Sequence, residues 1–163
     1  MLCILLTLAL VALDQLVKFL VRLHIPLGES RPFLPHLMDL TYVQNTGAAF
    51  SLFAGHTWIL TLISLIVSVF LAVLLLRRRL FRRPFGRIAL AVVLAGAVGN
   101  LIDRIRFGFV TDMFQTTFIR FAVFNVADIC VVLGGIALCV YLCFFYDKLE
   151  GKEPPHDAAD AGR

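Results

Sequence analysis

The stretch WILTLISLIVSVFLAVLLL at residues 58–76, together with the RRRLFRRPFGR that follows it at 77–87, decides the fold class of this chain. The first part holds 19 residues without a charge. A helix needs about 20 predominantly apolar residues to cross a bilayer. The two parts therefore predict a membrane-spanning helix that ends in a strongly basic loop.

The rest of the chain is also unusually apolar. Of its 163 residues, 60% are hydrophobic and only 16% are charged, and the mean hydropathy is +0.91. A soluble domain is about half apolar and a quarter charged. This excess excludes an ordinary cytosolic domain, a disordered chain and a large soluble enzyme with a small anchor. We expect a membrane all-α fold with four transmembrane helices, at about 2–23, 58–76, 88–104 and 121–146.

The basic loop predicts the orientation of the chain. Loops on the cytoplasmic side of a membrane carry the excess of lysine and arginine. With four crossings, both termini are then cytoplasmic, and the loops at about 22–57 and 103–120 face outward. No aromatic-interleaved basic face extends from the loop, so the net charge of +4 indicates topology rather than nucleic-acid binding. The six arginines of the loop are Arg77, Arg78, Arg79, Arg82, Arg83 and Arg87.

The two ends of the chain and the first outer loop lead to three further predictions. No lysine or arginine precedes the first apolar run, which continues beyond Asp14, so we interpret it as a retained helix rather than a signal peptide. The polar tail at 147–163 predicts a disordered cytoplasmic segment after a single membrane domain at 1–146. LMDLTYVQN at 37–45 has strand character and predicts a small β-sheet on the outer surface.

Unusual polar residues from separate parts of the sequence fall at one membrane level, the outer one. Helical spacing places three of them on one face of the third helix and two on one face of the fourth. The cytoplasmic halves of the second and fourth helices carry nothing comparable. The set is Asp14, Asn45, Asn100, Asp103, Arg104, Asp112, Asn125 and Asp128.

Two other spacings concern helix contacts. Asp14 and Lys18 are four residues apart, which predicts a local ion pair that stabilises the outer end of the first helix. Ala91, Ala95 and Gly99 form a stripe of small residues, which lets another helix approach closely.

Asp112 and Asp128 are the candidate catalytic residues. We expect Asp128 five to seven residues inside the fourth helix, roughly 8–10 Å below its start at about 1.5 Å per residue. An ionisable group there costs about 2.5–3.5 kcal/mol, so it should face a wet cavity or a partner. Neighbouring carboxylates resist double ionisation, so one can hold a proton while the other activates water. Taken alone, Asp112 is equally compatible with an exposed acid in a loop.

The cysteines and histidines predict no metal site. Cys3, Cys130, Cys139 and Cys143 lie in apolar runs, without a C-x-x-C pair and without a histidine nearby in the sequence. The histidines of the first outer loop form no H-E-x-x-H pattern. We therefore expect neither a metal ion nor another cofactor.

Five motifs of the chain resemble those of the signal peptidase II family, the bacterial lipoprotein signal peptidases. They occur in the family's order and together are highly specific. Ala95 and Met113 replace a common glycine and a frequent phenylalanine, and neither change removes a polar group. The motifs are DQLVK at 14–18, NTGAAF at 45–50, GNLIDR at 99–104, FGFVTD at 107–112 and FNVAD at 124–128.

The resemblance implies an intramembrane aspartic endopeptidase of the bacterial cytoplasmic (inner) membrane, with its active site at the outer face. Family substrates are prolipoproteins whose lipobox cysteine already carries diacylglycerol, and cleavage occurs just before that cysteine. We expect membrane lipid as a further partner, no nucleic acid, and a functional monomer. The family's catalytic aspartates fall on Asp112 and Asp128, and its supporting residues on Asp14, Asn45, Asn100, Asp103, Arg104 and Asn125.

Two rival functions follow from the residues alone. A small transporter or proton-coupled exporter would also carry an intramembrane carboxylate, but it needs a polar path through the whole membrane. The cytoplasmic halves of the second and fourth helices offer no such path. A purely structural membrane subunit would leave the polar motifs unexplained.

Overall fold

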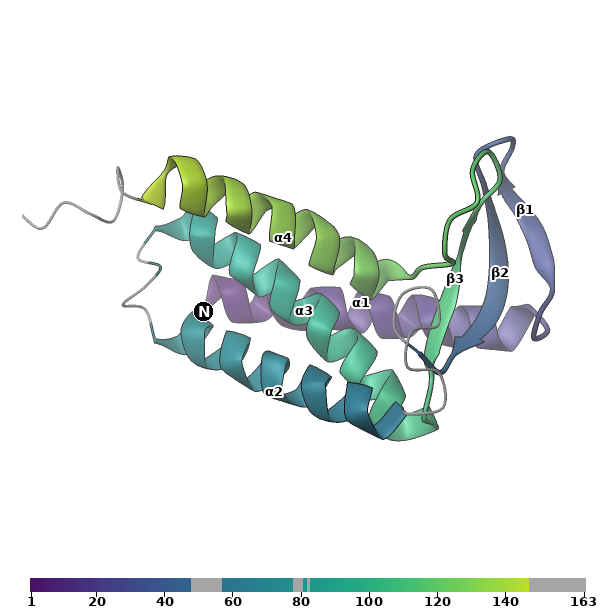
Figure 1. The fold of residues 1–163 in the computed structure, drawn as a ribbon, viewed down its shortest axis with the longest axis horizontal. Coiled ribbons are helices and arrows are strands. Elements are labelled where there is room, and N and C mark those ends of the chain that lie inside the picture. The colour runs from purple at the N-terminus through teal and green to yellow at the C-terminus, as the bar shows by residue number, and fades with distance from the viewer. Residues whose placement is uncertain (48–56, 78–80, 82, 147–163) are drawn as a thin grey trace, which may run out of the picture.

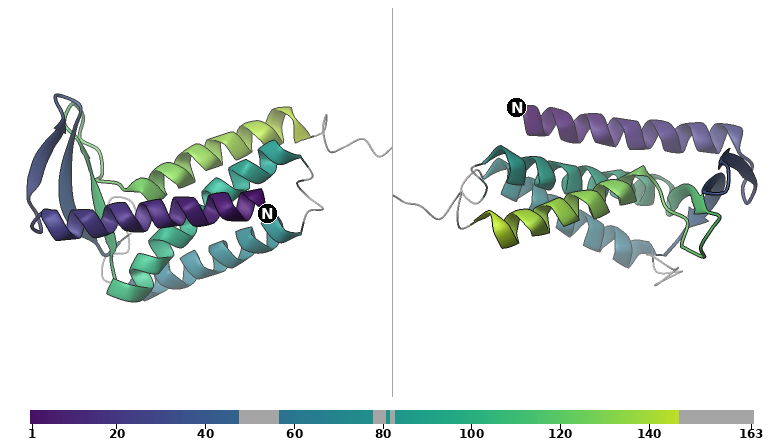
Figure 2. Two further views of the ribbon diagram at one scale, coloured as in Figure 1. Left: turned by 180° about the vertical axis from the view of Figure 1, so that it is seen from behind. Right: turned by 90° about the horizontal axis from the view of Figure 1, so that it is seen from above.

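The structure, a computed structural model, describes residues 1–47, 57–77, 81 and 83–146. Its helices are α1 (Leu2–His24), α2 (Thr57–Leu76), α3 (Pro84–Phe107) and α4 (Val126–Phe144). Each of them is long and apolar enough to cross a membrane. They form a bundle with a three-stranded sheet at one end (Figures 1 and 2). The predicted fold class, four membrane helices with a small sheet, is confirmed.

α3 is the central helix of the bundle. It packs against α1, α2 and α4. Gly99 explains one close approach, because a Cβ there would lie 2.6 Å from Asp14 Oδ2 and 3.2 Å from Ala127 Cβ. Along the same stripe, Thr7 of α1 donates a hydrogen bond to the carbonyl oxygen of Ala91 at 3.1 Å. The stripe of small residues thus lets α1 and α4 lie close to α3.

Bulky apolar side chains cover the outside of the bundle. Leu8 of α1, Phe70 of α2 and Leu133 of α4 are 60%, 59% and 60% exposed. A soluble bundle would bury such residues, whereas lipid tails cover them in a membrane. The apolar surplus of the sequence therefore lies mostly on the surface of the bundle, not in its core.

The sheet is antiparallel, with strand order β1-β2-β3. β1 (Ser30–Leu34) and β2 (Met38–Asn45) lie between α1 and α2, and β3 (Val110–Thr116) follows α3 directly. The chain turns from α3 into β3 at Gly108, whose φ of 76° lies in the left-handed region that favours glycine. β2 falls within the segment with predicted strand character. β3 is a correction to the predicted loop, because pairing with β2 orders a segment whose apolar pattern is broken by Asp112 and Gln115.

The bounds of two helices, α3 and α4, also differ from the expected ones. α3 begins at Pro84 and continues to Phe107, instead of spanning 88–104. α4 begins at Val126 rather than at about 121, because residue 124 first pairs with β3 through a bridge between Phe114 and Phe124. The expected position of Asp128 well inside the fourth helix is therefore wrong, since it lies in the first turn of α4.

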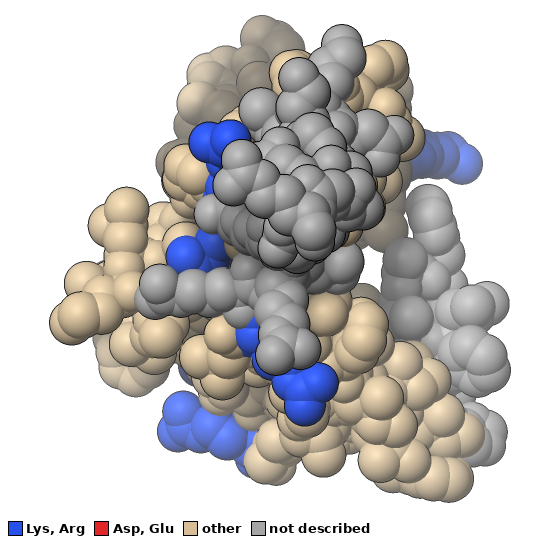
Figure 3. Space-filling view, turned by 90° about the vertical axis from the view of Figure 1, so that its left-hand side faces the viewer, with Lys and Arg blue, Asp and Glu red and all other residues tan. Residues whose placement is uncertain are grey.

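The end of the bundle opposite the sheet is basic. Figure 3 views this end, where the described residues display arginine but no acidic side chain. The N-terminus, the ends of α2 and α4 and the start of α3 all lie here (Figure 1). Of the six arginines predicted for the cytoplasmic loop, Arg77, Arg83 and Arg87 are described. The other three, the tail at 147–163 and residues 48–50 of the NTGAAF motif lie outside the described residues.

Candidate active site

The predicted polar residues meet at the end of the bundle that adjoins the sheet. Asn45 comes from β2, Asn100 and Arg104 from α3, Asp112 from β3 and Asp128 from α4. All of them line one groove of about 530 Å³, whose remaining wall is formed by Val110 and apolar residues between 121 and 133. This groove is called the catalytic groove below. Four elements, β2, α3, β3 and α4, thus contribute to one site.

Asp112 is held between two side-chain amides. Asn45 Nδ2 donates to Asp112 Oδ2 at 2.9 Å, and Asn125 Nδ2 donates to Oδ1 at 2.6 Å. Neither amide can flip to exchange its oxygen and nitrogen without losing another hydrogen bond. Asn45 Oδ1 accepts from Gly47 N and Asn125 Oδ1 accepts from Asp128 N, each at 2.9 Å. Both oxygens of Asp112 therefore act as acceptors, and a proton on this carboxyl must occupy one of the lone pairs that the amides leave free.

Burial changes the acidity of Asp112. The residue is only 3% exposed, which excludes the alternative of an exposed loop acid. Loss of hydration raises the pKa of Asp112 from its ordinary value of 3.8 to about 6, and the charge of Asp128 also raises it, while the hydrogen bonds from Asn45 and Asn125 lower it. A carboxyl with this pKa can hold a proton close to neutral pH, as a general acid must.

Asp128 has different surroundings, because it caps α4. Its Oδ2 accepts from the backbone N–H of Asn125 at 3.1 Å, and the Asn125 side chain accepts from Asp128 N, which completes a capping box. Asn100 Nδ2 donates to Asp128 Oδ1 at 2.8 Å. The start of a helix stabilises negative charge. The position of Asp128 at the start of α4 therefore favours a negative charge there, whereas burial opposes one on Asp112.

Asn100 and Asn125 connect the two carboxyl groups. Asn125 Nδ2 lies 3.1 Å from Asn100 Oδ1 in addition to its bond with Asp112. Asn100 Oδ1 also accepts from Lys18 Nζ at 2.9 Å. Because two donors fix the oxygen of Asn100, its amide nitrogen must face Asp128. The two asparagines thus hold the pair at a fixed separation.

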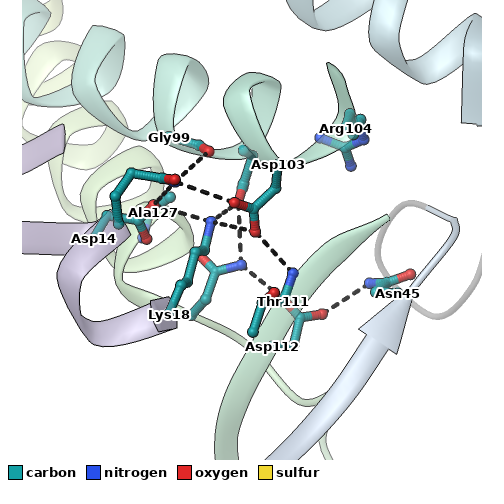
Figure 4. Close-up of polar contacts among 12 residues, drawn as sticks. Asp14, Lys18, Asn45, Gly99, Asp103, Arg104, Thr111, Asp112 and Ala127 are labelled. Carbon is teal, nitrogen blue, oxygen red and sulfur yellow. Dashed lines mark hydrogen bonds and ion pairs between the residues drawn. The ribbon is translucent and has the colours of Figure 1, made fainter. Parts of the chain in front are cut away.

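Lys18 has a larger role than its spacing predicts. The residue is fully buried, with 0% exposed. Its Nζ lies 3.0 Å from Asp14 Oδ2, as the local spacing predicts, and also 3.4 Å from Asp103 Oδ2 of α3. Figure 4 shows the ammonium group between the two aspartates. Periodicity along α1 cannot reveal the second partner, because that contact depends on how α1 packs on α3.

Asp14 and Asp103 act on the site through the backbone. Asp14 Oδ1 accepts from the N–H of Ala127, and Asp103 Oδ2 accepts from the N–H of Thr111, each at 2.9 Å. Each of these N–H groups belongs to the residue directly before a candidate catalytic aspartate (Figure 4). One lysine thus supplies the counter-charge for both aspartates that fix the backbone beside the pair.

Arg104 lines the catalytic groove, but it lies apart from the hydrogen-bonded cluster in Figure 4. Its Nη1 lies 3.4 Å from Ser64 Oγ, and its Nη2 lies 3.4 Å from the carbonyl oxygen of Gly47. Its Nε is buried and has no partner among the described residues. The guanidinium therefore brings positive charge and donor capacity to the groove, whereas Asp103 does not line it.

Comparison with known proteins identifies relatives over most of the chain. A family model described as signal peptidase (SPase) II matches residues 6–144. A protein named lipoprotein signal peptidase from Enterococcus faecalis is 43% identical over 145 residues, which cover 88% of each chain. A protein of the same name from Clostridioides difficile is 41% identical over 148 residues, which cover 91% of this chain and 99% of that protein.

Two solved structures share the fold. Both are described as bacterial membrane enzyme structures obtained by the in meso method. The one at 2.3 Å resolution has a TM-score of 0.75 and 27% identity, and the match covers 93% of this chain and 92% of that chain. The one at 1.9 Å resolution has a TM-score of 0.79 and 28% identity, and the match covers 88% and 93%.

Proposed function

The chain belongs to the signal peptidase II family, and on this premise we propose that Asp112 and Asp128 are its catalytic residues. It is an aspartic endopeptidase that removes the signal peptides of diacylglyceryl-modified prolipoproteins by cutting just before the lipidated cysteine. The assignment of the pair rests on one observation, that the two carboxyl groups line the same groove in contrasting surroundings. A single chain, with residues 1–146 as one domain, supplies every residue of the proposed site, which supports a functional monomer.

Hydrolysis by the pair starts with one proton on Asp112 and none on Asp128. Asp128 takes a proton from a water molecule, whose oxygen bonds to the carbonyl carbon of the scissile peptide. Asp112 gives its proton to the carbonyl oxygen. When the C–N bond then breaks, the departing amine receives the proton that Asp128 took, and one hydroxyl of the intermediate returns its proton to Asp112 as the C=O bond re-forms. Arg104 stabilises the negative charge that develops in the groove.

The apolar wall of the catalytic groove suits a substrate embedded in lipid. Val131, Val132 and Leu133 of α4 line the same groove as Asp128. The diacylglyceryl group can stay in the bilayer while the signal helix lies against the enzyme. Two lipid-buried elements then orient the peptide bond at the carboxyl pair, and such orientation is a large part of catalysis.

The proposed function is tested by incubating the purified full-length chain with a diacylglyceryl-modified prolipoprotein. Release of the signal peptide is followed as a mobility shift on a gel. The matched control is the same prolipoprotein without the lipid, which should be cut far more slowly. Equal cleavage of both forms would contradict the requirement for the lipid, and no cleavage of either would contradict the peptidase activity.

We predict that the basic end of the bundle is cytoplasmic and that the sheet and the catalytic groove face outward. A reporter fused after Arg163 should be active in the cytoplasm, and one inserted near His36 should be active outside, because the arginines hold the α2–α3 connection inside. Both fusions should be made in one expression strain, with protein amounts measured. The reverse pattern would place the proposed site on the cytoplasmic side.

The pH dependence of cleavage provides a separate prediction. The proposed acid is protonated below a pKa of about 6 and loses its proton as the pH rises through that value. We expect kcat/KM to fall above pH 6, towards a tenfold loss for each further pH unit. The measurement is the cleavage rate between pH 5 and 8.5 in one detergent, on enzyme shown to remain folded. A rate that is flat or rising from pH 6 to 8 would contradict the assignment of Asp112 as the acid.

Cleavage should survive metal chelators. The pair can activate water without a Lewis acid, and in the part of the chain that the structure describes, the side chains that donate hydrogen bonds to it are the amides of Asn45, Asn100 and Asn125. We expect an unchanged rate after incubation with EDTA or phenanthroline, compared with a mock-treated sample. A loss that zinc restores would contradict the aspartic mechanism.

A further inference from the structure

A second groove lies between α1 and α3 near the sheet, and it shares no lining residue with the catalytic groove. Its volume is about 630 Å³. We call it the arginine groove, and its lining residues are Gln15, Leu16, Phe19, Arg22, Leu23, Arg106 and Phe107.

Two guanidinium groups lie over one aromatic ring in this groove. The Cζ atoms of Arg22 and Arg106 are 4.6 Å and 5.1 Å from the centroid of the Phe107 ring. Arg22 Nη1 also donates to Thr111 Oγ1 at 2.8 Å. Among the described residues, neither guanidinium has a carboxylate within 4.0 Å. Two neighbouring positive charges without a counter-charge repel each other, so an anion bound between them would stabilise the pair.

Towards the middle of the bundle, the groove is lined by two apolar side chains, Leu16 and Phe19, and by Gln15, whose amide nitrogen is already bonded to Asp14, Gly99 and Asp103. Leu16 and Phe19 are each 54% exposed, and in a membrane they contact lipid. Phe19 precedes Arg22 by three residues, which is about 4.5 Å along α1. The groove therefore offers an apolar wall and then positive charge as it runs towards the end of the helices, which is the order of acyl chain and phosphate in a phospholipid.

We propose that the arginine groove binds an anionic phospholipid, with its phosphate between Arg22 and Arg106 and an acyl chain along Leu16 and Phe19. The planar fork of arginine pairs with two phosphate oxygens at once, and each such bond is charge-assisted. The proposal goes beyond the peptidase activity. A lipid bound there would also be linked indirectly to the active site, because Arg22 donates a hydrogen bond to the side chain of Thr111, the residue before Asp112.

The test is native mass spectrometry of the full-length chain released from a maltoside detergent and titrated with phosphatidylglycerol. Arg106→Gln should weaken the first bound phosphatidylglycerol by about tenfold or more, the scale expected for a lost hydrogen bond to a charged group. Arg106 is exposed and its side chain makes no hydrogen bond among the described residues, so the change should leave the fold intact. Arg31→Gln, an equal charge change on β1, should bind as the parent does.

Parallel titrations identify what is recognised. Phosphatidylcholine, which carries a phosphate but no net charge, should bind more weakly than phosphatidylglycerol, and inorganic phosphate at the same concentration should not displace the lipid. Unchanged binding by Arg106→Gln would overturn the proposal, as would an equal loss in Arg31→Gln. Equal binding of phosphatidylcholine would refute recognition of an anionic headgroup, and displacement by inorganic phosphate would identify an ion site instead of a lipid site. Lipid binding is read without substrate, so its failure leaves the peptidase assignment standing.

Discussion

Cleavage by the Asp112→Asn or the Asp128→Asn enzyme should fall by about 10²–10⁴-fold or more, the contribution of general acid–base catalysis. Asparagine keeps the shape of aspartate, but it can neither accept nor donate the catalytic proton. The two residues act as a unit, so the double variant should be little worse than either single variant. Asp39→Asn makes the same chemical change on β2, away from the catalytic groove, and should cleave as the parent does.

The asparagine variants need a stability measurement beside the activity assay. Both oxygens of Asp112 accept from amides that cannot turn over, so an amide nitrogen introduced there faces a donor. At Asp128 the change weakens the cap of α4, which costs about 0.5–2 kcal/mol. The unfolding midpoint in detergent should therefore fall modestly, while both variants still insert into the membrane. A folded single variant that cleaves near the parent rate would refute the pair, and Asp103 could not replace it, because Asp103 does not line the groove.

Replacing Lys18 by methionine should lower the free energy of unfolding by about 3–5 kcal/mol, the range for breaking a buried ion pair by removing one partner. Methionine fills similar space, but it leaves the carboxylates of Asp14 and Asp103 buried without their counter-charge. The measurement is unfolding in mixed SDS micelles. Activity should fall mainly through kcat, because the backbone N–H groups before both proposed catalytic aspartates are held by those two carboxylates.

A combined variant separates the loss of charge balance from the loss of packing. Adding Asp14→Asn and Asp103→Asn to Lys18→Met removes the stranded charges, so much of the lost stability should return. Arg31→Met removes a positive charge from exposed β1 and should change the free energy of unfolding little. A loss below about 1 kcal/mol for Lys18→Met would contradict the role of the lysine as shared counter-charge.

More of the fold than of the detailed geometry of the site could be predicted from the sequence. Long apolar runs specify membrane helices directly, and the positions of the polar residues along those runs indicate their common level. β3 could not be predicted, because its order comes from pairing with β2 rather than from its own pattern. The contact between Lys18 and Asp103 could not be predicted either, because it depends on how α1 packs against α3.

The start of α4, unlike β3 and the second partner of Lys18, could have been predicted, because the sequence contains a helix-capping pattern there. Asn125 stands three residues before Asp128, which is the spacing of a helix cap and its N3 partner. The apolar residues at 121–124 extend the hydrophobic run past the true start, and hydropathy alone therefore places the helix too early. Giving the capping pattern more weight than hydropathy would have placed Asp128 in the first turn of the helix.

The distribution of the site over the chain determines when a newly made molecule can act. Asp128 lies on α4, which leaves the ribosome after α1, α2 and α3, and Ala127 beside it donates a hydrogen bond to Asp14 on α1. A nascent chain that has inserted α1, α2 and α3 still lacks half of the proposed pair. With this pair as the catalytic residues, proteolytic competence arises only after α4 has been made and has docked, so a molecule that still lacks α4 cannot attack neighbouring membrane proteins during biogenesis.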